Sequence, residues 1–303
     1  MIGENTLETL SGYVGKEHVH PGEPLAPRTS FRLGGPCDVL VEPQDEEQLA
    51  RVMRYLNLAT IPFFVLGNGS NTLVRDVGYE GVVVHIGPAL GQIEVEGTRI
   101  TAGAGAMLSQ VAAAAARAGL SGLEFASGIP GSVGGAVVMN AGAYGGEMCQ
   151  VVECVRVVSP EGELLEFDRD TMEFGYRKSI LRARPYTACS VRMNLTPGDP
   201  EEIRGKMEEL NRQRREKQPL EYPSAGSTFK RPEGYFAGKL IMDAGLRGFQ
   251  IGGARVSDKH CGFLINAGNA TAADVIDLMD EVRERVKRKF GVKLEPEIVI
   301  IGK

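Results

Sequence analysis

The sequence lacks the signals of a membrane or secreted protein. It has no uninterrupted apolar run of about 18 residues, so we expect no segment to span a bilayer. Its N-terminal stretch, MIGENTLETLSGYVG, has neither a basic region nor an apolar core, so we expect no secretory signal. The sequence therefore predicts a cytoplasmic protein without membrane insertion.

Cysteine and histidine are scarce. The five cysteines are odd in number and form no CxxC pair, and there are only four histidines. A disulfide framework and a zinc site are therefore poorly supported, so we predict free thiols and no metal. The net charge of −5 also argues against a nucleic-acid partner, because such proteins are normally basic.

Common nucleotide and hydrolase motifs are absent. The loop GNGSNT (67–72) lacks the third glycine of GxGxxG, and GYFAGKL (234–240) lacks the spacing and the hydroxyl residue of a P-loop. HExxH and GxSxG are missing as well. We therefore expect neither a Rossmann domain nor a P-loop ATPase.

Glycine, in contrast, is abundant. The chain has 39 glycines, and nine of them lie within residues 119–146. Because that stretch is otherwise apolar and varied, it does not resemble a flexible Gly/Ser linker. Glycine at such density lets the backbone approach a ligand or a second strand closely.

Two loops of glycine, serine and asparagine are candidate cofactor sites. The first contains Gly67, Asn68, Gly69, Ser70 and Asn71, and the second contains Ser127, Gly128, Ile129, Pro130, Gly131, Ser132, Gly134 and Gly135. Successive backbone N–H groups in such loops suit a diphosphate. A tight turn explains either loop alone. Two loops about 60 residues apart favour a dinucleotide, which needs contacts along its length.

Hydrophobic periodicity predicts a mixed α+β chain. Helices are expected over 44–58, 106–118, 200–217 and 271–290, the last with Thr271 as N-cap and Asp274 three residues later. Strands are expected over 26–43 (with a turn), 61–66, 81–86, 92–103 (as a hairpin), 151–158, 162–167, 188–195 and 297–302. The stretch KQPLEYPSAG (217–226) is a plausible domain boundary.

Basic residues gather late in the chain. Residues 204–259 hold 12 Lys and Arg against 7 Asp and Glu, although the whole chain is acidic. Such a segment suits a small polyanion. A solvated helix face is an equal explanation for the bases within 204–215.

Seven strings together resemble the family of UDP-N-acetylenolpyruvoylglucosamine reductases. They are TSFRLGGP (29–36), LGNGSNTLV (66–74), EFASGIPGSVGGAVVMNAGAYGGE (124–147), YRKS (176–179), SAGSTFKRP (224–232), GYFAGKLIMDAGLRG (234–248) and EPEIVIIG (295–302). The resemblance covers nearly the whole chain, and its specificity lies in the combination and order of the strings. At 303 residues the chain resembles the shorter form of the family, which lacks an extra tyrosine-bearing loop.

The resemblance implies an FAD-binding domain of the vanillyl-alcohol oxidase type, built from two α+β subdomains, and a smaller C-terminal α+β substrate domain. It places the first subdomain at residues 1–90, with 297–303 as a possible addition. The second subdomain is then 91–212 and the substrate domain 213–296.

The resemblance also implies a reaction. NADPH reduces non-covalently bound FAD, and the enolpyruvyl group of a UDP-sugar is then reduced to give UDP-N-acetylmuramate for peptidoglycan. The implied partners are small molecules only. A covalent flavin link through His85 is the less favoured alternative.

Three residues match the family's catalytic positions. Arg177 would face the substrate carboxylate, Ser227 would protonate the α-carbon, and Glu297 would lie near the same carboxylate. Without the resemblance, a surface arginine, a turn serine and an edge-strand glutamate are the simpler interpretations. Weaker candidates for substrate contacts are Tyr176, Lys230, Arg231, Tyr235, Lys239 and Lys259.

Two other functions stay open at this point. One is an FAD-dependent oxidase of a sugar or alcohol on the same fold, and the C-terminal strings argue against it. The other is a nucleotide-sugar sensor without catalysis, and retention of Arg177, Ser227 and Glu297 together argues against that. A Cys261–His260 nucleophile receives little weight, because adjacent residues of a strand point to opposite faces.

Overall fold

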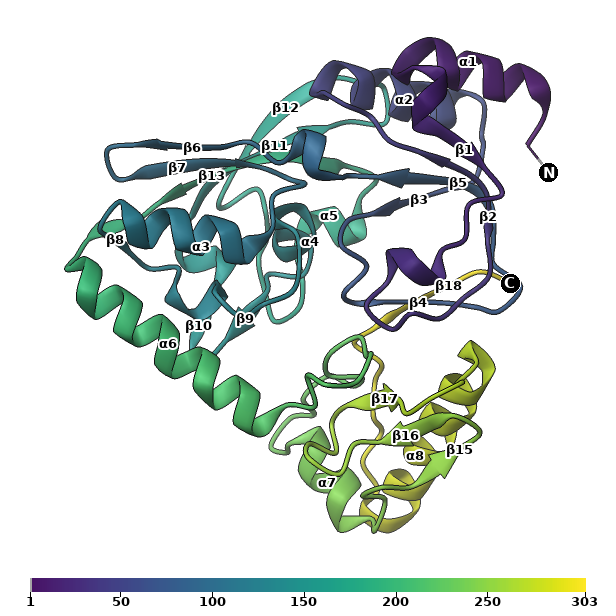
Figure 1. Ribbon diagram of the computed structural model, residues 1–303, viewed down its shortest axis with the longest axis vertical. Helices are drawn as coiled ribbons and strands as arrows, with labels where there is room; N and C mark the ends of the chain where they lie inside the picture. The colour runs from purple at the N-terminus through teal and green to yellow at the C-terminus, as the bar shows by residue number, and fades with distance from the viewer. Residues whose placement is uncertain (1) are drawn as a thin grey trace. The chain divides into compact units, whose positions relative to one another are not determined.

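The computed structural model describes residues 2–303, which fall into two compact units (Figure 1). Unit 1 comprises the residues up to 21 together with 38–68 and 81–213. Unit 2 comprises residues 22–37, 69–80 and 214–303. Each unit has its own hydrophobic core, so each is stabilised by its own buried side chains.

The first sheet of unit 1 begins the predicted β–α pattern. Its strand order is β1 (Val19–Pro21), β2 (Cys37–Val41), β5 (Tyr79–His85) and β3 (Phe63–Leu66). The helix α2 (Glu46–Leu58) follows β2, as the sequence predicts, and buries an apolar stripe of Leu49, Val52, Met53 and Leu56. The helix α1 (Glu4–Val14), which the periodicity did not predict, buries Leu10 and Val14.

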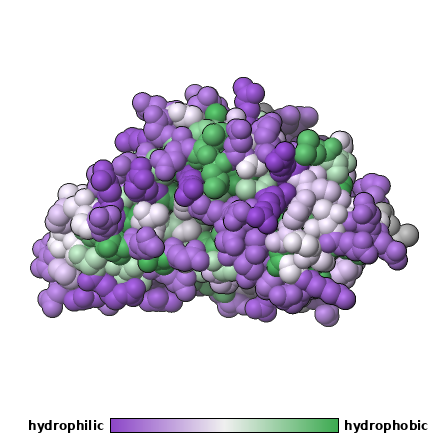
Figure 2. Space-filling view, turned by 90° about the horizontal axis from the view of Figure 1, so that it is seen from above, coloured by the Kyte–Doolittle hydropathy of each residue, from purple (hydrophilic) through white to green (hydrophobic). Residues whose placement is uncertain are grey.

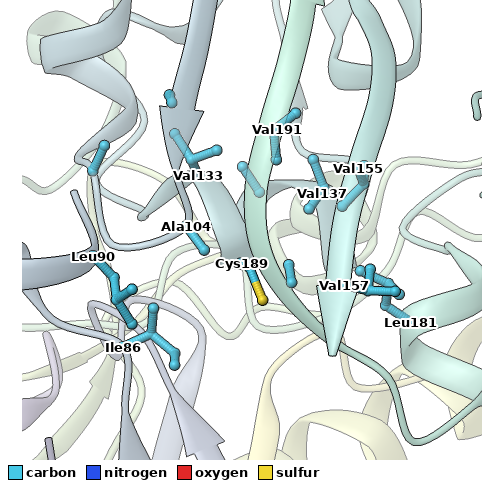
Figure 3. Close-up of a cluster of buried hydrophobic side chains, with 14 of the residues drawn as sticks. Ile86, Leu90, Ala104, Val133, Val137, Val155, Val157, Leu181, Cys189 and Val191 are labelled. Carbon is cyan, nitrogen blue, oxygen red and sulfur yellow. The ribbon is translucent and has the colours of Figure 1, made fainter. Parts of the chain in front are cut away.

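The second sheet of unit 1 is antiparallel. Its order is β12 (Leu164–Asp168), β11 (Val152–Val158), β13 (Thr187–Asn194), β7 (Arg99–Gly103) and β6 (Ile93–Glu96). The strands β6 and β7 form the hairpin expected over 92–103. The helices α3 (Leu108–Arg117) and α4 (Val133–Val138) pack on this sheet. Figure 3 shows Val133 and Val137 of α4 beside Val191 and Val155 of the strands.

The opposite face of this sheet is polar because side chains alternate along a strand. Ser190 and Arg156 are cross-strand neighbours, as are Val191 and Val155. Glu46 of α2 accepts a hydrogen bond from Ser190 Oγ at 3.3 Å and pairs with the Arg156 guanidinium at 3.1 Å. One sheet thus packs its apolar face on α4 while its polar face meets α2.

Short elements complete unit 1. They are β8 (Leu120–Ser121) with β14 (Thr196–Pro197), β9 (Gly142–Ala143) with β10 (Gly146–Glu147), and α5 (Ile180–Ala183). The helix α6 (Pro200–Lys217) has the bounds that the sequence predicts, and Ile203 and Leu210 are buried.

Unit 2 joins segments from distant parts of the chain. The strand β4 (Thr72–Val74) pairs in parallel with β18 (Val299–Ile301). A three-stranded sheet has the order β15 (Gln250–Ile251), β16 (Ala254–Val256) and β17 (Leu264–Asn266), and α8 (Ala272–Phe290) packs on it. The short helix α7 (Ala237–Asp243) contacts α8.

The start of α8 confirms the predicted cap. Thr271 Oγ1 accepts from the N–H of Asp274 at 3.0 Å, and the Asp274 carboxylate accepts from the N–H of Thr271 at 2.9 Å. The Asp76 carboxylate accepts two more bonds, from the N–H groups of Ala272 and Ala273. The helix therefore begins with its free N–H groups satisfied.

The strand predicted over 26–43 is wrong for its first half. Residues 26–28 form a 3₁₀ turn, and the strand begins only at Cys37. Proline lacks the N–H that a ladder needs, and Pro27 and Pro36 interrupt the segment. Arg32 also has a positive φ of 56°, which is incompatible with an extended strand.

No helix within residues 2–303 is both long and apolar enough to cross a membrane.

Candidate functional site

The first glycine loop, residues 67–71, joins β3 to β4 and carries a run of unpaired donors. Within residues 2–303, none of its five backbone N–H groups donates to a protein acceptor. Five consecutive free N–H groups attract an anion without a buried cation. The structure therefore supports the predicted diphosphate chemistry of this loop.

Close approach explains the two glycines of this loop. A Cβ on Gly67 would lie 2.4 Å from Ser132 Oγ, and one on Gly69 would lie 2.2 Å from the Arg28 carbonyl oxygen. Gly69 also has a φ of +61°, which disfavours other residues. A larger residue at position 69 would displace the backbone of residues 28 and 29, whereas one at position 67 would have to move the Ser132 hydroxyl.

The start of the first loop contacts the second loop within unit 1. Asn68 Nδ2 donates to the carbonyl oxygen of Pro130 at 2.5 Å, so the first loop is tied to the second. Ser132, which a side chain at position 67 would strike, lies in the second loop as well. Residues 67 and 68 of the first loop therefore lie beside the second loop in this unit.

The second loop offers fewer free donors than its sequence suggests. Gly134 donates to the Ala104 carbonyl at 2.9 Å, and Gly135 donates to Ser132 Oγ at 3.4 Å. The N–H groups of Gly128, Gly131 and Ser132 have no acceptor within residues 2–303. The N–H groups of Gly134 and Gly135 are thus already used within the protein. These two glycines would have to contact a cofactor through other atoms.

Two further hydrogen bonds hold the start of the second loop. Ser127 Oγ donates to the Glu124 carbonyl at 2.9 Å and accepts from Asn211 Nδ2 of α6 at 3.2 Å. The free N–H groups of both loops, and the close approach of neighbouring atoms at Gly67 and Gly69, together fit the diphosphate of a dinucleotide cofactor.

Arg177 lies at the tip of a tight turn in unit 1. Gly175 and Lys178 exchange two backbone hydrogen bonds, at 3.0 and 3.1 Å, around Tyr176 and Arg177. Arg177 has a φ of 52°, a left-handed conformation that costs about 1–3 kcal/mol for a residue other than glycine. Such strain persists only where surrounding contacts hold the turn.

Two buried polar side chains hold that turn. Asn140 is 1% exposed, and its Nδ2 donates to the Gly175 carbonyl at 3.1 Å while its Oδ1 accepts from the N–H of Cys149 at 2.9 Å. Ser179 is fully buried, and its hydroxyl donates to the Val138 carbonyl at 2.9 Å. Both residues fall inside the family-like strings, yet nothing in their spacing revealed this function.

The Arg177 guanidinium is partly engaged. One nitrogen donates to the Gly142 carbonyl at 3.3 Å, and the group lies 5.4 Å from the centre of the Tyr176 ring. Tyr176, a predicted substrate contact, is about half exposed.

In unit 2, the structure brings the segments of Ser227 and Glu297 together. The N–H of Glu297 donates to the carbonyl of Thr228 at 2.8 Å, and Phe229 forms a bridge with Pro296. Ser227 is half-buried and Glu297 is 9% exposed. Two residues 70 positions apart in the chain thus belong to neighbouring, bonded backbones.

Ser30 and Asn71 connect this pair of segments to the first loop. The Ser30 N–H donates to the Gly69 carbonyl at 3.2 Å, and its hydroxyl donates to the Ser224 carbonyl at 2.7 Å, three residues before Ser227. Asn71 Nδ2 donates to the Glu297 carbonyl at 3.3 Å. Ser30 is not among the predicted site residues, although it lies in the string TSFRLGGP.

The predicted basic substrate contacts of unit 2 have protein partners. Lys230 pairs with Glu295 at 3.2 Å, Lys239 with Asp243 at 2.6 Å, and Lys259 with Glu221 at 3.6 Å. Such partly exposed pairs are weak, about 0–1 kcal/mol, so an anionic ligand can compete for the ammonium groups. Arg231 stacks over the Phe236 ring at 4.6 Å, next to the half-exposed Tyr235.

The alternative nucleophile is not supported. Burial raises the pKa of the Cys261 thiol, so little thiolate forms near neutral pH. Burial lowers the pKa of His260, whose Nδ1 accepts a hydrogen bond from the N–H of Gly262. His85, the alternative flavin attachment point, contacts the Glu42 carboxylate at 2.8 Å.

Comparison with known families assigns both parts of the chain. A model described as "FAD binding domain" matches residues 37–168, and the model of the "UDP-N-acetylenolpyruvoylglucosamine reductase, C-terminal domain" matches residues 218–301. These matches confirm the predicted α+β fold with an FAD-binding domain followed by a smaller C-terminal domain.

Curated relatives match over almost their full length. UDP-N-acetylenolpyruvoylglucosamine reductase of Caldanaerobacter subterraneus subsp. tengcongensis is 51% identical and covers 99% of both chains. That of Agathobacter rectalis is 54% identical over 92% of this chain and 93% of its own. The crystal structure of the reductase from Thermus caldophilus is similar with a TM-score of 0.80 at 38% identity, covering 92% of this chain and 97% of that one.

Proposed function

The chain belongs to the UDP-N-acetylenolpyruvoylglucosamine reductase family, and from this we propose how its residues carry out the reaction. It is an FAD-dependent oxidoreductase that reduces the enolpyruvyl group of UDP-N-acetylglucosamine enolpyruvate to give UDP-N-acetylmuramate. The observation that carries this conclusion is the 51% identity over 99% of both chains.

The loops 67–71 and 127–135 hold the cofactor in this proposal. Their free N–H groups bind the diphosphate, and the Asn68–Pro130 bond keeps the two loops together. Bound FAD would supply hydride chemistry between NADPH and the methylene carbon of the substrate. All contacts are non-covalent.

Arg177 faces the substrate carboxylate. Reduction at the methylene carbon leaves negative charge on the α-carbon and its carboxylate, and a guanidinium binds a carboxylate through two donors. One well-placed donor of this kind is worth about 3–4 kcal/mol of transition-state stabilisation. The strained turn supports this role, because backbone strain concentrates at functional residues.

Ser227 protonates the α-carbon. A hydroxyl is a very weak acid, but the carbon of an enediolate is a strong enough base to accept its proton. General acid catalysis of this kind contributes about 10²- to 10⁴-fold. Glu297 lies near the same carboxylate, and the bond from its N–H to Thr228 supports a shared site with Ser227.

Tyr176, Lys230, Arg231, Tyr235, Lys239 and Lys259 supply the remaining contacts to the substrate in this proposal. The ion pairs of the three lysines are weak, so the substrate diphosphate can replace the carboxylate in each pair. Residues 1–90 and 91–212 form the two FAD-binding subdomains, with 297–303 as a candidate addition to the first, while 213–296 form the substrate domain. NADPH is the reductant in this proposal, and the reaction takes place in the cytoplasm, where it serves cell-wall synthesis, cell shape and division.

Half-reactions measured in a stopped-flow spectrometer test this function. The purified protein should be yellow, NADPH should bleach it, and the UDP-enolpyruvyl sugar should restore the colour. For Ser227→Ala we expect normal bleaching but recoloration slowed about 10²- to 10⁴-fold. Ser109→Ala on α3 is the matched control and should behave like the parent.

Two results would contradict the proposal. Normal turnover of Ser227→Ala would contradict the role of Ser227 as the proton donor. A protein that stays colourless after reconstitution with FAD, or that releases peroxide with a sugar and no NADPH, would contradict the reductase itself.

A further inference from the structure

Asn71 forms two hydrogen bonds with the backbone of residues 297–299, one at Glu297 and one at Val299. Its side-chain Nδ2 donates to the Glu297 carbonyl at 3.3 Å, and its own carbonyl accepts from the N–H of Val299 at 2.9 Å. The parallel pairing of β4 with β18 starts at the next residue, where Thr72 faces Val299. The side chain of Asn71 thus extends the ladder by one bond beyond the strand.

The same glutamate is fixed from its other side. Its N–H donates to the carbonyl of Thr228, and the N–H of Thr228 donates to Gly262 at 2.9 Å. Thr228 is 1% exposed, and its hydroxyl accepts from the N–H of Leu264 at 3.1 Å. The N–H of Glu297 is therefore held by the buried residue Thr228, and its carbonyl is held by Asn71.

We propose that Asn71 is a positioning residue that acts through Glu297, rather than a flavin ligand through its side chain. This inference rests on the proposed function, in which Glu297 lies near the substrate carboxylate. One side-chain donor of Asn71 is already committed to the Glu297 carbonyl, whereas its backbone N–H belongs to the free run of residues 67–71. The residue therefore links the cofactor loop to the backbone of a catalytic residue.

The consequence is a selective effect on one half of the reaction. Without the amide, the carbonyl of Glu297 loses the hydrogen bond from Asn71, and the segment 296–298 gains freedom. Small displacements of a group near the reacting atoms cost up to about 10²-fold in rate. The reduction of the flavin by NADPH does not require Glu297 in this mechanism, so only the second half-reaction should slow.

The test uses Asn71→Ala in the full-length protein. We expect recoloration by the UDP-enolpyruvyl sugar to slow about 10- to 100-fold, while bleaching by NADPH stays within about threefold of the parent. The affinity for FAD, measured by quenching of flavin fluorescence, should change little. Asn57→Ala is the matched control, because Asn57 Nδ2 also donates to a backbone carbonyl, that of Met53 at 2.8 Å.

A double-mutant cycle separates an action through Glu297 from a general loss of structure. If Asn71 acts through Glu297, then Asn71→Ala should slow recoloration little further in a Glu297→Gln background. Effects that multiply in the double variant would overturn the proposal. So would a loss of FAD affinity with normal recoloration at saturating flavin, which would make Asn71 a cofactor ligand.

Amide hydrogen exchange gives a measurement that needs no activity. In the flavin-free protein, peptides covering 295–301 should exchange severalfold faster in Asn71→Ala, and peptides from α2 should not. Unchanged exchange there would contradict the proposal even if the enzyme were active. The proposed function would be contradicted instead if NADPH bleached the parent protein but the UDP-enolpyruvyl sugar did not restore its colour. In that case the exchange result would still decide whether Asn71 holds residues 297–299.

Discussion

Asn140 shows how one buried amide can support a strained turn. Its two hydrogen bonds connect the backbone of Gly175, next to Arg177, with that of Cys149. Its own φ of 41° is left-handed, a conformation that asparagine tolerates better than most residues. Removal of the amide would leave the N–H of Cys149 without its acceptor, and the Gly175 carbonyl would keep only its bond from the N–H of Lys178.

We therefore expect Asn140→Ala to destabilise the protein. Each unsatisfied buried group costs about 1–3 kcal/mol, and alanine adds strain at the positive φ. Urea unfolding should show a loss of about 2–4 kcal/mol, together with slower recoloration because the Arg177 turn is freed. Asn57→Ala, which removes an amide-to-carbonyl bond in α2, should cost no more than about 1 kcal/mol. Equal stability of Asn140→Ala and the parent would show that these two bonds do not hold the turn.

The sequence could propose residues for the site but not their hydrogen bonds. The Gly/Ser/Asn composition made both loops candidates, because those residues provide free donors and close approach. Whether an N–H is free depends on which distant carbonyl reaches it, as the bond from Gly134 to Ala104 shows. Ser30 and Asn140 were missed for the same reason, since a hydrogen bond across the fold leaves no local signal.

Among the elements, the long amphipathic ones were predictable. α2, α6 and α8 each bury apolar residues at helical spacing, and their observed bounds match the expected ranges to within two residues. α4 and α7 are shorter than eight residues and contain glycine, so their periodicity is too brief to detect. The segment before Cys37 was misassigned because its residue types suggested a strand while its prolines forbade one.

The cap of α8 gives the fold a pH dependence. The N–H groups of Thr271 and Gly253 donate to the Asp274 carboxylate and lower its pKa below the ordinary 3.8. A carboxyl group whose pKa is lower in the folded state stabilises that state above pH 3.8. This stabilisation is lost as the pH falls through the folded pKa.

We expect Asp274→Asn to lower the free energy of unfolding at pH 6, with the difference from the parent shrinking toward pH 2. Urea unfolding at several pH values measures this difference. Asp277→Asn, an exposed residue of the same helix, should show no such trend. Thr271→Ala should cost about 1 kcal/mol through the lost N-cap. A difference that grew as the pH fell would contradict the assigned direction of the Asp274 pKa.

At the scale of the whole molecule, the five cysteines are free, and four of them are buried. Burial raises the pKa of Cys154 and Cys261, and it raises that of Cys189 to about 12. Cys149 is half-buried, and burial raises its pKa as well. Since the thiolate is the reactive form, the folded protein should resist modification at neutral pH.

Labelling with a thiol reagent at pH 7 measures this resistance. We expect slow reaction of Cys149 alone in the folded protein and rapid reaction of all five thiols in denaturant. Mass spectrometry of labelled peptides identifies which cysteine has reacted. Rapid labelling of Cys189 or Cys261 without denaturant would contradict the burial described above.

Hydrophilic residues cover most of the face shown in Figure 2, and hydrophobic ones appear there as separate areas. The large apolar side chains with the greatest exposure include Leu58, Val77 and Phe236, which come from different segments of the chain. Single exposed apolar residues are normal on a protein surface.

The pairing of β4 with β18 has a consequence for synthesis. A ribosome makes residues 69–80 early, but their partner strand at 299–301 emerges more than 200 residues later. Unit 1 consists only of residues up to 213, so its core can assemble while the rest is still being translated. Unit 2 has to wait, and Leu73, fully buried in the finished protein, stays without its neighbouring strand until then. The nascent chain therefore carries an incomplete second core for most of its elongation, the stage at which association with other chains is most harmful.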